Sequence, residues 1–167
     1  GMPFNRRPKA IKLDYRVKLT DSPNRIRQTG FSKVSTVPGR DMPEMVVILQ
    51  QRKENADGSI TAKRVGTQIY KFTQSTNGWV EGKAFDIMYG DITKHPGYTK
   101  RMDLMRGDAT IYARNSKGEN VPVDENGWAD ASATPTHAIV KFDSSHGGAY
   151  IGSIGTTLWL DNIKWVY

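Results

Sequence analysis

The feature that most constrains the fold is a strict alternation of apolar and charged residues at positions 10–19. A period of two places one set of side chains on each face of a β-strand, with one face buried and the other in water. Strands of this kind are typical of antiparallel sheets. The apolar set is Ile11, Leu13, Tyr15, Val17 and Leu19, and the charged set is Lys12, Asp14, Arg16 and Lys18.

Further apolar runs follow, separated by turn signals. The dipeptide Asp57-Gly58 favours a hairpin because glycine accepts a positive φ, and a turn is predicted at residues 21–27 around Pro23. Residues 99–114 fit either a short helix or a strand, and residues 115–135, rich in Gly, Pro, Asn and Asp, are predicted to be irregular. Strands are predicted at residues 45–49, 60–72 with a bend at Gly66, 79–89, 136–142 and 157–167.

Several strands without an amphipathic helix pattern indicate an all-β fold. We expect a jelly-roll-like β-sandwich of two antiparallel sheets, formed by a single domain over residues 1–167.

Composition excludes several classes of site. The chain has no cysteine, which rules out a disulfide framework, a thiolate nucleophile and a Cys-ligated metal. The chain contains no run of about 18 apolar residues, the length needed to span a membrane. The net charge is +7, but the basic residues are scattered along the sequence, as on the solvated faces of strands. An anionic partner is the alternative, with an acidic glycan as compatible as nucleic acid, and nucleic-acid binding is not expected.

The last predicted strand breaks its own alternation near Asp161 and Asn162. Either both faces of this strand are buried, or a β-bulge shifts its phase. We expect Trp159 and Trp165 to lie in the core. An aspartate within so apolar a strand needs a hydrogen-bond donor, a cation or an arginine as its partner.

The chain resembles a carbohydrate metabolism domain of Bacteroidetes surface and periplasmic proteins over nearly its whole length. The segments that carry the resemblance are Pro3-Phe4, residues 7–10, 144–150 and 155–162. The resemblance implies a jelly-roll-like sandwich at the C-terminus of a longer exported protein, located in the periplasm or at the cell surface, with other domains as possible partners. It also implies that the first strands of the domain are missing, which would leave the strand at residues 11–19 unpaired on one side. It implies no particular activity.

Candidate sugar-binding residues are aromatic side chains in or beside predicted loops, because a flat ring can stack on the C–H face of a sugar. The alternative is that these rings fill the core. Polar neighbours would bind sugar hydroxyls or acidic groups. The stacking candidates are Trp79, Tyr89, Tyr98 and Trp128, and the polar candidates are Asn126, Asp130 and Arg101.

Catalytic and metal motifs are weak. Residues 143–146 contain Asp, Ser and His, but adjacent strand residues point to opposite faces and cannot form a triad. No spacing selects a glycosidase carboxylate pair, and the three histidines are too widely spaced for zinc. By analogy with jelly rolls, Asp161 is a candidate ligand for a structural calcium ion. The carboxylates considered are Glu44, Glu81, Asp86, Asp91, Asp103 and Asp108.

The leading hypothesis is a non-catalytic carbohydrate-binding or accessory module of a glycan-processing surface protein, with a polysaccharide or oligosaccharide as its partner. One alternative is a glycoside hydrolase or lyase that uses a carboxylate pair. Another is a structural or protein-docking domain of a surface assembly. The first hypothesis requires no cofactor apart from the calcium ion considered above.

Overall fold

A computed structural model describes residues 1–22 and 24–167 of this all-β chain, so the centre of the turn predicted at Pro23 lies outside the described residues. Two short 3-10 helices, η1 (Lys100–Met102) and η2 (Gly107–Ala109), accompany the strands. The strands are β1 (Met2–Pro3), β2 (Ala10–Lys18), β3 (Ile26–Arg27), β4 (Ser35–Thr36), β5 (Glu44–Glu54), β6 (Ile60–Lys71), β7 (Val80–Asp86), β8 (Met88–Tyr89), β9 (Ile111–Arg114), β10 (Asn120–Trp128), β11 (His137–Asp143), β12 (Ile151–Gly152) and β13 (Thr157–Val166).

The largest sheet, sheet A, has the strand order β1-β11-β5-β6-β10-β9, and β8 also pairs with β6. Strand β10 runs parallel to β6, whereas the other pairs in this sheet are antiparallel. The expectation of two antiparallel sheets is therefore wrong for sheet A. The chain leaves β6 through β7, β8 and a long connection, so it can return beside β6 in the same direction.

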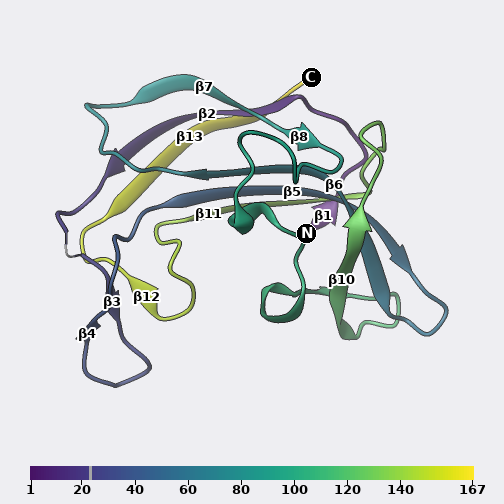
Figure 1. Ribbon diagram of the computed structural model, residues 1–167, viewed down its shortest axis with the longest axis horizontal. Coiled ribbons are helices and arrows are strands. Elements are labelled where there is room, and N and C mark those ends of the chain that lie inside the picture. Colours follow the sequence, from purple (N-terminus) through teal and green to yellow (C-terminus); the bar gives the residue numbers. More distant parts are fainter. Residues whose placement is uncertain (23) are drawn as a thin grey trace.

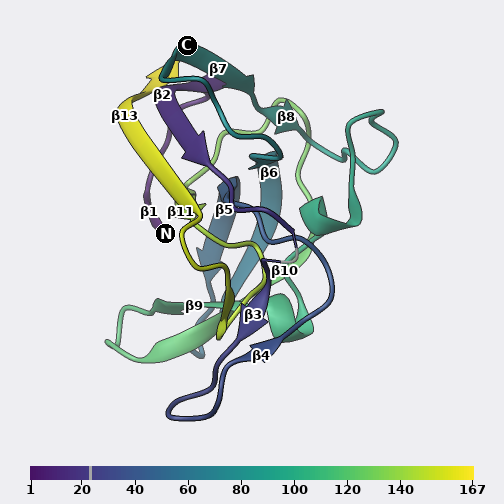
Figure 2. The ribbon, with the colours of Figure 1, turned by 90° about the vertical axis from the view of Figure 1, so that its left-hand side faces the viewer.

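A second sheet, sheet B, has the antiparallel order β13-β2-β7 and packs against sheet A. Figures 1 and 2 show it as a layer along one side of β5, β6 and β11. The core between the two layers joins the inward face of β2 to one face of β5 and β6. Its buried members include Ile11, Leu13, Val17, Met45, Val47, Leu49, Val65, Phe72 and Phe85. The small sheet β12-β3-β4 contributes no residue to this core and lies at one end of the molecule (Figure 1).

The opposite face of sheet A is covered by the connection at residues 90–110. Val46, Ile48 and Ile69 of the sheet pack there with Ile92 and Met102 of the connection. Strand β5 is thus buried on both faces, which explains its continuous apolar run. The ambiguous residues 99–114 form η1, η2 and the short strand β9.

The strands predicted at residues 10–19, 60–72, 136–142 and 157–167 are confirmed with small changes in their ends. The strand predicted at 45–49 is longer, Glu44–Glu54, and the one predicted at 79–89 is divided between β7 of sheet B and β8, which pairs with β6. Two further expectations about strands are wrong. Strand β2 is not a free edge, because it pairs with β13 on one side and β7 on the other. Residues 115–135 are not irregular throughout, because they contain the nine-residue strand β10. Pro122, Asn126 and Gly127 lower the strand propensity of β10, yet both of its neighbours hold it in place.

Two bulges decide where side chains point. Opposite Leu49 and Gln50, the β6 register jumps from Gly66 to Arg64, so Val65 turns into the core and Arg64 joins the opposite face. In β13 the register shifts between Asp161 and Lys164, which confirms the bulge alternative for the last strand. Asn162 adopts a left-handed φ of 51° at this bulge.

Near this second bulge, the expected burial of Trp159 is wrong. We expected the side chain in the core, but it is 38% exposed on the outer face of sheet B. The inward positions of this part of β13 belong to Leu158 and Leu160 instead. Trp165, beyond the bulge, does pack against the core, with its ring centroid 5.0 Å from that of Phe4.

Candidate functional site

The outer face of sheet B brings two of the predicted site residues together. Trp79, directly before β7, lines a hollow of about 240 Å³ together with Asp161 of β13. A second hollow, of about 410 Å³, continues from it along the sheet towards Lys12 and Lys164. We call this surface the platform, defined by Lys12, Asp14, Arg16, Trp79, Glu81, Trp159, Asp161, Asn162 and Lys164.

Hydrogen bonds to Asp14 fix the middle of the platform. Its Oδ2 accepts from the side-chain amide of Asn162 at 2.6 Å, and its Oδ1 accepts from the backbone N–H of Gly82 at 2.5 Å. These two bonds, the first more than the second, lower the pKa of Asp14 below 3.8. Asp14 therefore stays a carboxylate at mildly acidic pH and ties β13 to β7 across β2.

The aromatic part of the platform consists of two exposed indole rings. The side chain of Trp79 is 46% exposed, and Trp159 lies across β2 from it. Register pairs Trp159 with Arg16, whose guanidinium carbon lies 5.0 Å from the centre of the Trp159 ring. Such a cation–π contact fixes the ring orientation. The platform therefore offers flat apolar surfaces beside charged and amide groups, an arrangement suited to stacking and hydroxyl binding.

The other predicted aromatic residues lie elsewhere and are less exposed. Tyr89 packs against the main core, donates a hydrogen bond from its hydroxyl to the Pro8 carbonyl at 2.6 Å, and has a pKa raised by burial. Tyr98, which belongs to the connection at residues 90–110, and Trp128 pack against the core between that connection and sheet A. The structure thus separates these three rings from Trp79, and their sugar-binding role stays a prediction.

The polar candidates are also dispersed. Asp130 is exposed and accepts hydrogen bonds from the backbone and hydroxyl of Ser132, which lower its pKa. Asn126 lines a large trough at the far end of sheet A. Arg101 forms an ion pair with Glu44, whose side chain is fully buried, at 2.7 Å. None of these three residues lies on the platform.

Arg101 and Glu44 line a small polar pocket of about 230 Å³ that also contains residues of the run 143–146. Glu44 and Asp143 are register partners on β5 and β11, so two carboxylates line one pocket. Each has a cationic partner, Arg101 for Glu44 and Lys141 for Asp143.

The serine and histidine of the same run point to a different aspartate. The hydroxyl of Ser145 lies 2.7 Å from Oδ1 of buried Asp41, and Nδ1 of His146 lies 3.7 Å from the same oxygen. Nδ1 of His146 also lies 3.2 Å from the Met42 carbonyl. Because these contacts give no Ser–His hydrogen bond, the run acts as a structured turn, in line with the expectation that it forms no triad.

Asp161, the residue predicted to bind calcium, is exposed. Asp161 accepts a hydrogen bond from the backbone N–H of Asn162 at 2.7 Å. Across residues 1–22 and 24–167, no three histidine or carboxylate side chains are grouped so that they could hold a metal ion. The candidate calcium site therefore stays a prediction that rests on Asp161 alone.

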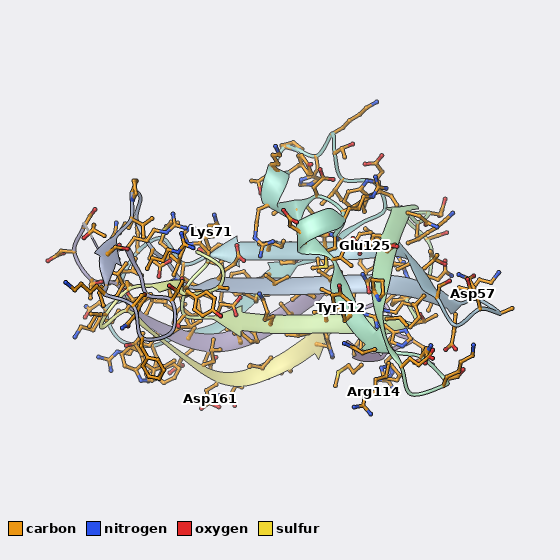
Figure 3. All side chains as sticks on the ribbon, turned by 90° about the horizontal axis from the view of Figure 1, so that it is seen from below. Asp57, Lys71, Tyr112, Arg114, Glu125 and Asp161 are labelled. Atoms are coloured by element: carbon orange, nitrogen blue, oxygen red, sulfur yellow. The ribbon has the colours of Figure 1, made fainter. Side chains whose placement is uncertain are left out.

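Sequence reasoning missed a buried ion pair in sheet A. Arg64 and Glu125 are both fully buried and contact each other at 2.5 and 2.7 Å. Glu125 also accepts hydrogen bonds from the Gln50 side chain and the Met105 backbone, both at 2.6 Å, while Arg64 donates to the Met102 carbonyl. The pair thus holds the connection at residues 90–110 against the sheet, as Figure 3 illustrates for Glu125 beside the helical turns.

His137 gives a prediction on pH dependence. Burial, followed by the positive charge of Arg52, lowers the pKa of His137 below 6.5. In the pH range between the lowered pKa of His137 in the folded chain and its ordinary pKa of 6.5 in the unfolded chain, the unfolded chain binds more protons than the folded chain. The free energy of unfolding therefore falls as the pH decreases through 6.5. We expect His137→Gln to flatten this slope in urea unfolding between about pH 7.5 and 5, because its side chain does not titrate. The exposed His95, changed to Gln, is the control, and equal slopes for both variants would contradict the assignment to His137.

Comparisons of this chain with protein-family models, curated proteins and solved structures gave no match in any of the three. In the part of the chain that the structure describes, no helix is long and apolar enough to cross a membrane.

Proposed function

We propose that the platform binds carbohydrate and that the chain is a non-catalytic carbohydrate-binding or accessory module. The observation that supports this most is the exposed Trp79 ring beside a polar hollow lined by Asp14, Glu81, Asp161 and Asn162. Aromatic rings provide a stacking surface, and carboxylate and amide groups bind hydroxyls.

The charges of the platform indicate a neutral ligand. Three carboxylates, of Asp14, Glu81 and Asp161, lie beside three cations. With this balance, no ligand of one charge sign is strongly favoured. A neutral oligosaccharide or polysaccharide fits such a surface. The cations are Lys12, Arg16 and Lys164.

Replacing Trp79 with alanine tests this proposal. We expect Trp79→Ala to weaken binding of a neutral glycan, first identified on a glycan array, by about tenfold, the equivalent of about 1.4 kcal/mol of lost stacking. Isothermal titration of both proteins measures the change. Tyr112→Ala is the matched control, because Tyr112 is 61% exposed on β9 in sheet A and should leave the affinity unaltered. No binding to any neutral glycan, or equal losses in the two variants, would refute the proposal.

The proposed context follows the sequence resemblance. We propose a jelly-roll-like sandwich in a longer exported, glycan-processing protein at the cell surface or in the periplasm. The all-β architecture of sheets A and B is compatible with this context.

An enzyme is the second candidate, a glycoside hydrolase or lyase. Its best-placed carboxylates are Glu44 and Asp143, which line one pocket. Release of reducing ends during the same titrations would favour the enzyme over the binding module.

A further inference from the structure

A trough of about 680 Å³ lies where the β5–β6 hairpin extends beyond sheet B (Figure 1). In Figure 3, Asp57 marks the tip of this hairpin. The face of β5 that carries Met45, Val47 and Leu49 under sheet B carries Gln51 and Lys53 beyond it. Polar residues therefore replace apolar ones at the point where the covering layer ends, and the size of the trough lies within the range of ligand sites.

The lining of the trough has one sign of charge. The charged side chains that face it are those of Lys53 and Lys63, Arg52 borders it with its backbone, and no carboxylate lines it. Among residues 1–22 and 24–167, none of the ion pairs involves either lysine. Concave surfaces lined by charges of one sign concentrate the field and attract ligands of the opposite sign. The neutral members are Gln51, Asn55, Thr61, Ala62, Asn126 and Thr136.

Behind the trough, the side chain of Arg52 connects β5 to the buried ion pair. Its Nε donates to the Gln50 side chain at 2.8 Å, and Gln50 in turn donates to Glu125 at 2.6 Å. Arg64 already donates to both carboxylate oxygens of Glu125, so the Glu125 carboxylate is fully engaged. Because alternate residues of a strand point to opposite faces, the guanidinium of Arg52 lies on the face of sheet A opposite the trough, where it joins Gln50 and Glu125.

From these observations we propose that the trough is a second binding site, which takes a uronic-acid oligosaccharide. A ligand of this class carries carboxylates for the two lysines and hydroxyls for the amide and hydroxyl side chains, which include Asn126. A single-stranded nucleic acid would also be anionic, but its bases need aromatic stacking surfaces. The lining residues include no aromatic side chain. This site is independent of the platform.

The test uses a short oligogalacturonate as the probe, with its fully methyl-esterified form as the neutral counterpart. We expect the acid form to bind and to shift the amide resonances of Lys53, Lys63 and Asn126, with an affinity that falls as salt is added. The ester should not bind in the trough. Inorganic phosphate and a short oligothymidylate serve as competitors that report a general anion site or a nucleic-acid site.

Charge-reversal variants locate the site. The double variant Lys53→Glu/Lys63→Glu should weaken oligogalacturonate binding by about tenfold or more. Both lysines are exposed, so thermal unfolding should show an intact fold. Asp124, the register partner of Thr61, is the control of opposite sign, and Asp124→Asn should strengthen binding. Trp79→Ala should leave oligogalacturonate binding unchanged, which separates this site from the platform.

Three results would overturn the proposal. The first is equal binding of the acid and the ester, and the second is an affinity for oligogalacturonate that the double lysine variant leaves intact. The third is displacement of oligogalacturonate by oligothymidylate at concentrations below those at which oligogalacturonate itself binds. Displacement by millimolar phosphate alone, with no preference for the uronate, would likewise reduce the trough to a general anion site and overturn the assignment to a saccharide.

Discussion

Glu125→Gln is expected to lower the free energy of unfolding by about 3–5 kcal/mol, because it leaves the buried guanidinium of Arg64 without its counter-charge. Arg64 and Glu125 are both fully buried, and Glu125 accepts hydrogen bonds from Gln50 and Met105 as well. Neutralising the carboxylate therefore weakens several contacts at once. Urea unfolding followed by tryptophan fluorescence measures the change.

Two comparisons make this experiment specific to burial. Asp143→Asn breaks a pair whose lysine, Lys141, is 53% exposed, so its effect should stay under about 1 kcal/mol. The double variant Arg64→Met/Glu125→Leu removes both charges and should recover much of the loss. A Glu125→Gln protein as stable as the Asp143→Asn protein would show that the pair is not buried in solution.

Phe72→Ala should cost about 3–5 kcal/mol, the range for removing a large buried aromatic side chain. Phe72 is 2% exposed, and its ring lies 4.9 Å from Tyr15, 5.1 Å from Tyr70 and 6.4 Å from Phe85, measured between centroids. Tyr15 and Phe85 belong to sheet B, and Phe72 directly follows β6 of sheet A. The cavity would therefore open where the two sheets meet.

The control for this variant is Phe31→Ala. The Phe31 side chain is fully exposed, so its removal should change stability by less than about 0.5 kcal/mol. Thermal and urea unfolding of the three proteins measure the difference. A loss below about 1 kcal/mol for Phe72→Ala would mean that the sheets do not pack through this aromatic cluster.

The sequence predicts the strands well where the apolar pattern alone determines burial. The alternation of Ile11, Leu13 and Val17 predicts β2, and the continuous run of β5 predicts a strand covered on both faces. These patterns are local, so they can be detected without knowledge of the partner strands. The pairing of β2 between β13 and β7 is not local, and the expectation of a free edge there is wrong.

The sequence fails where burial depends on a distant partner. Glu125 has the pattern of a solvent-exposed loop residue, and only its contact with Arg64, 61 positions earlier, allows it to be buried in β10. For Trp159 the error is the opposite one, because the sequence predicts a buried ring. Arg16 of the neighbouring strand holds this ring on the outer face. Trp79 is a candidate because its ring can stack on a sugar, Asp161 because its carboxylate can bind calcium, and no sequence signal indicates that they share one hollow.

The position of β2 in the middle of sheet B has a consequence for the order of folding. Lys18 pairs with Thr157, so β2 must wait for a strand roughly 140 residues further along the chain. Until β13 has left the ribosome, one side of β2 has unpaired backbone groups and its apolar face is incompletely covered. A nascent chain that ends before residue 157 should therefore be protease-sensitive and a target for chaperones, and sheet B should be among the last parts of the molecule to become ordered.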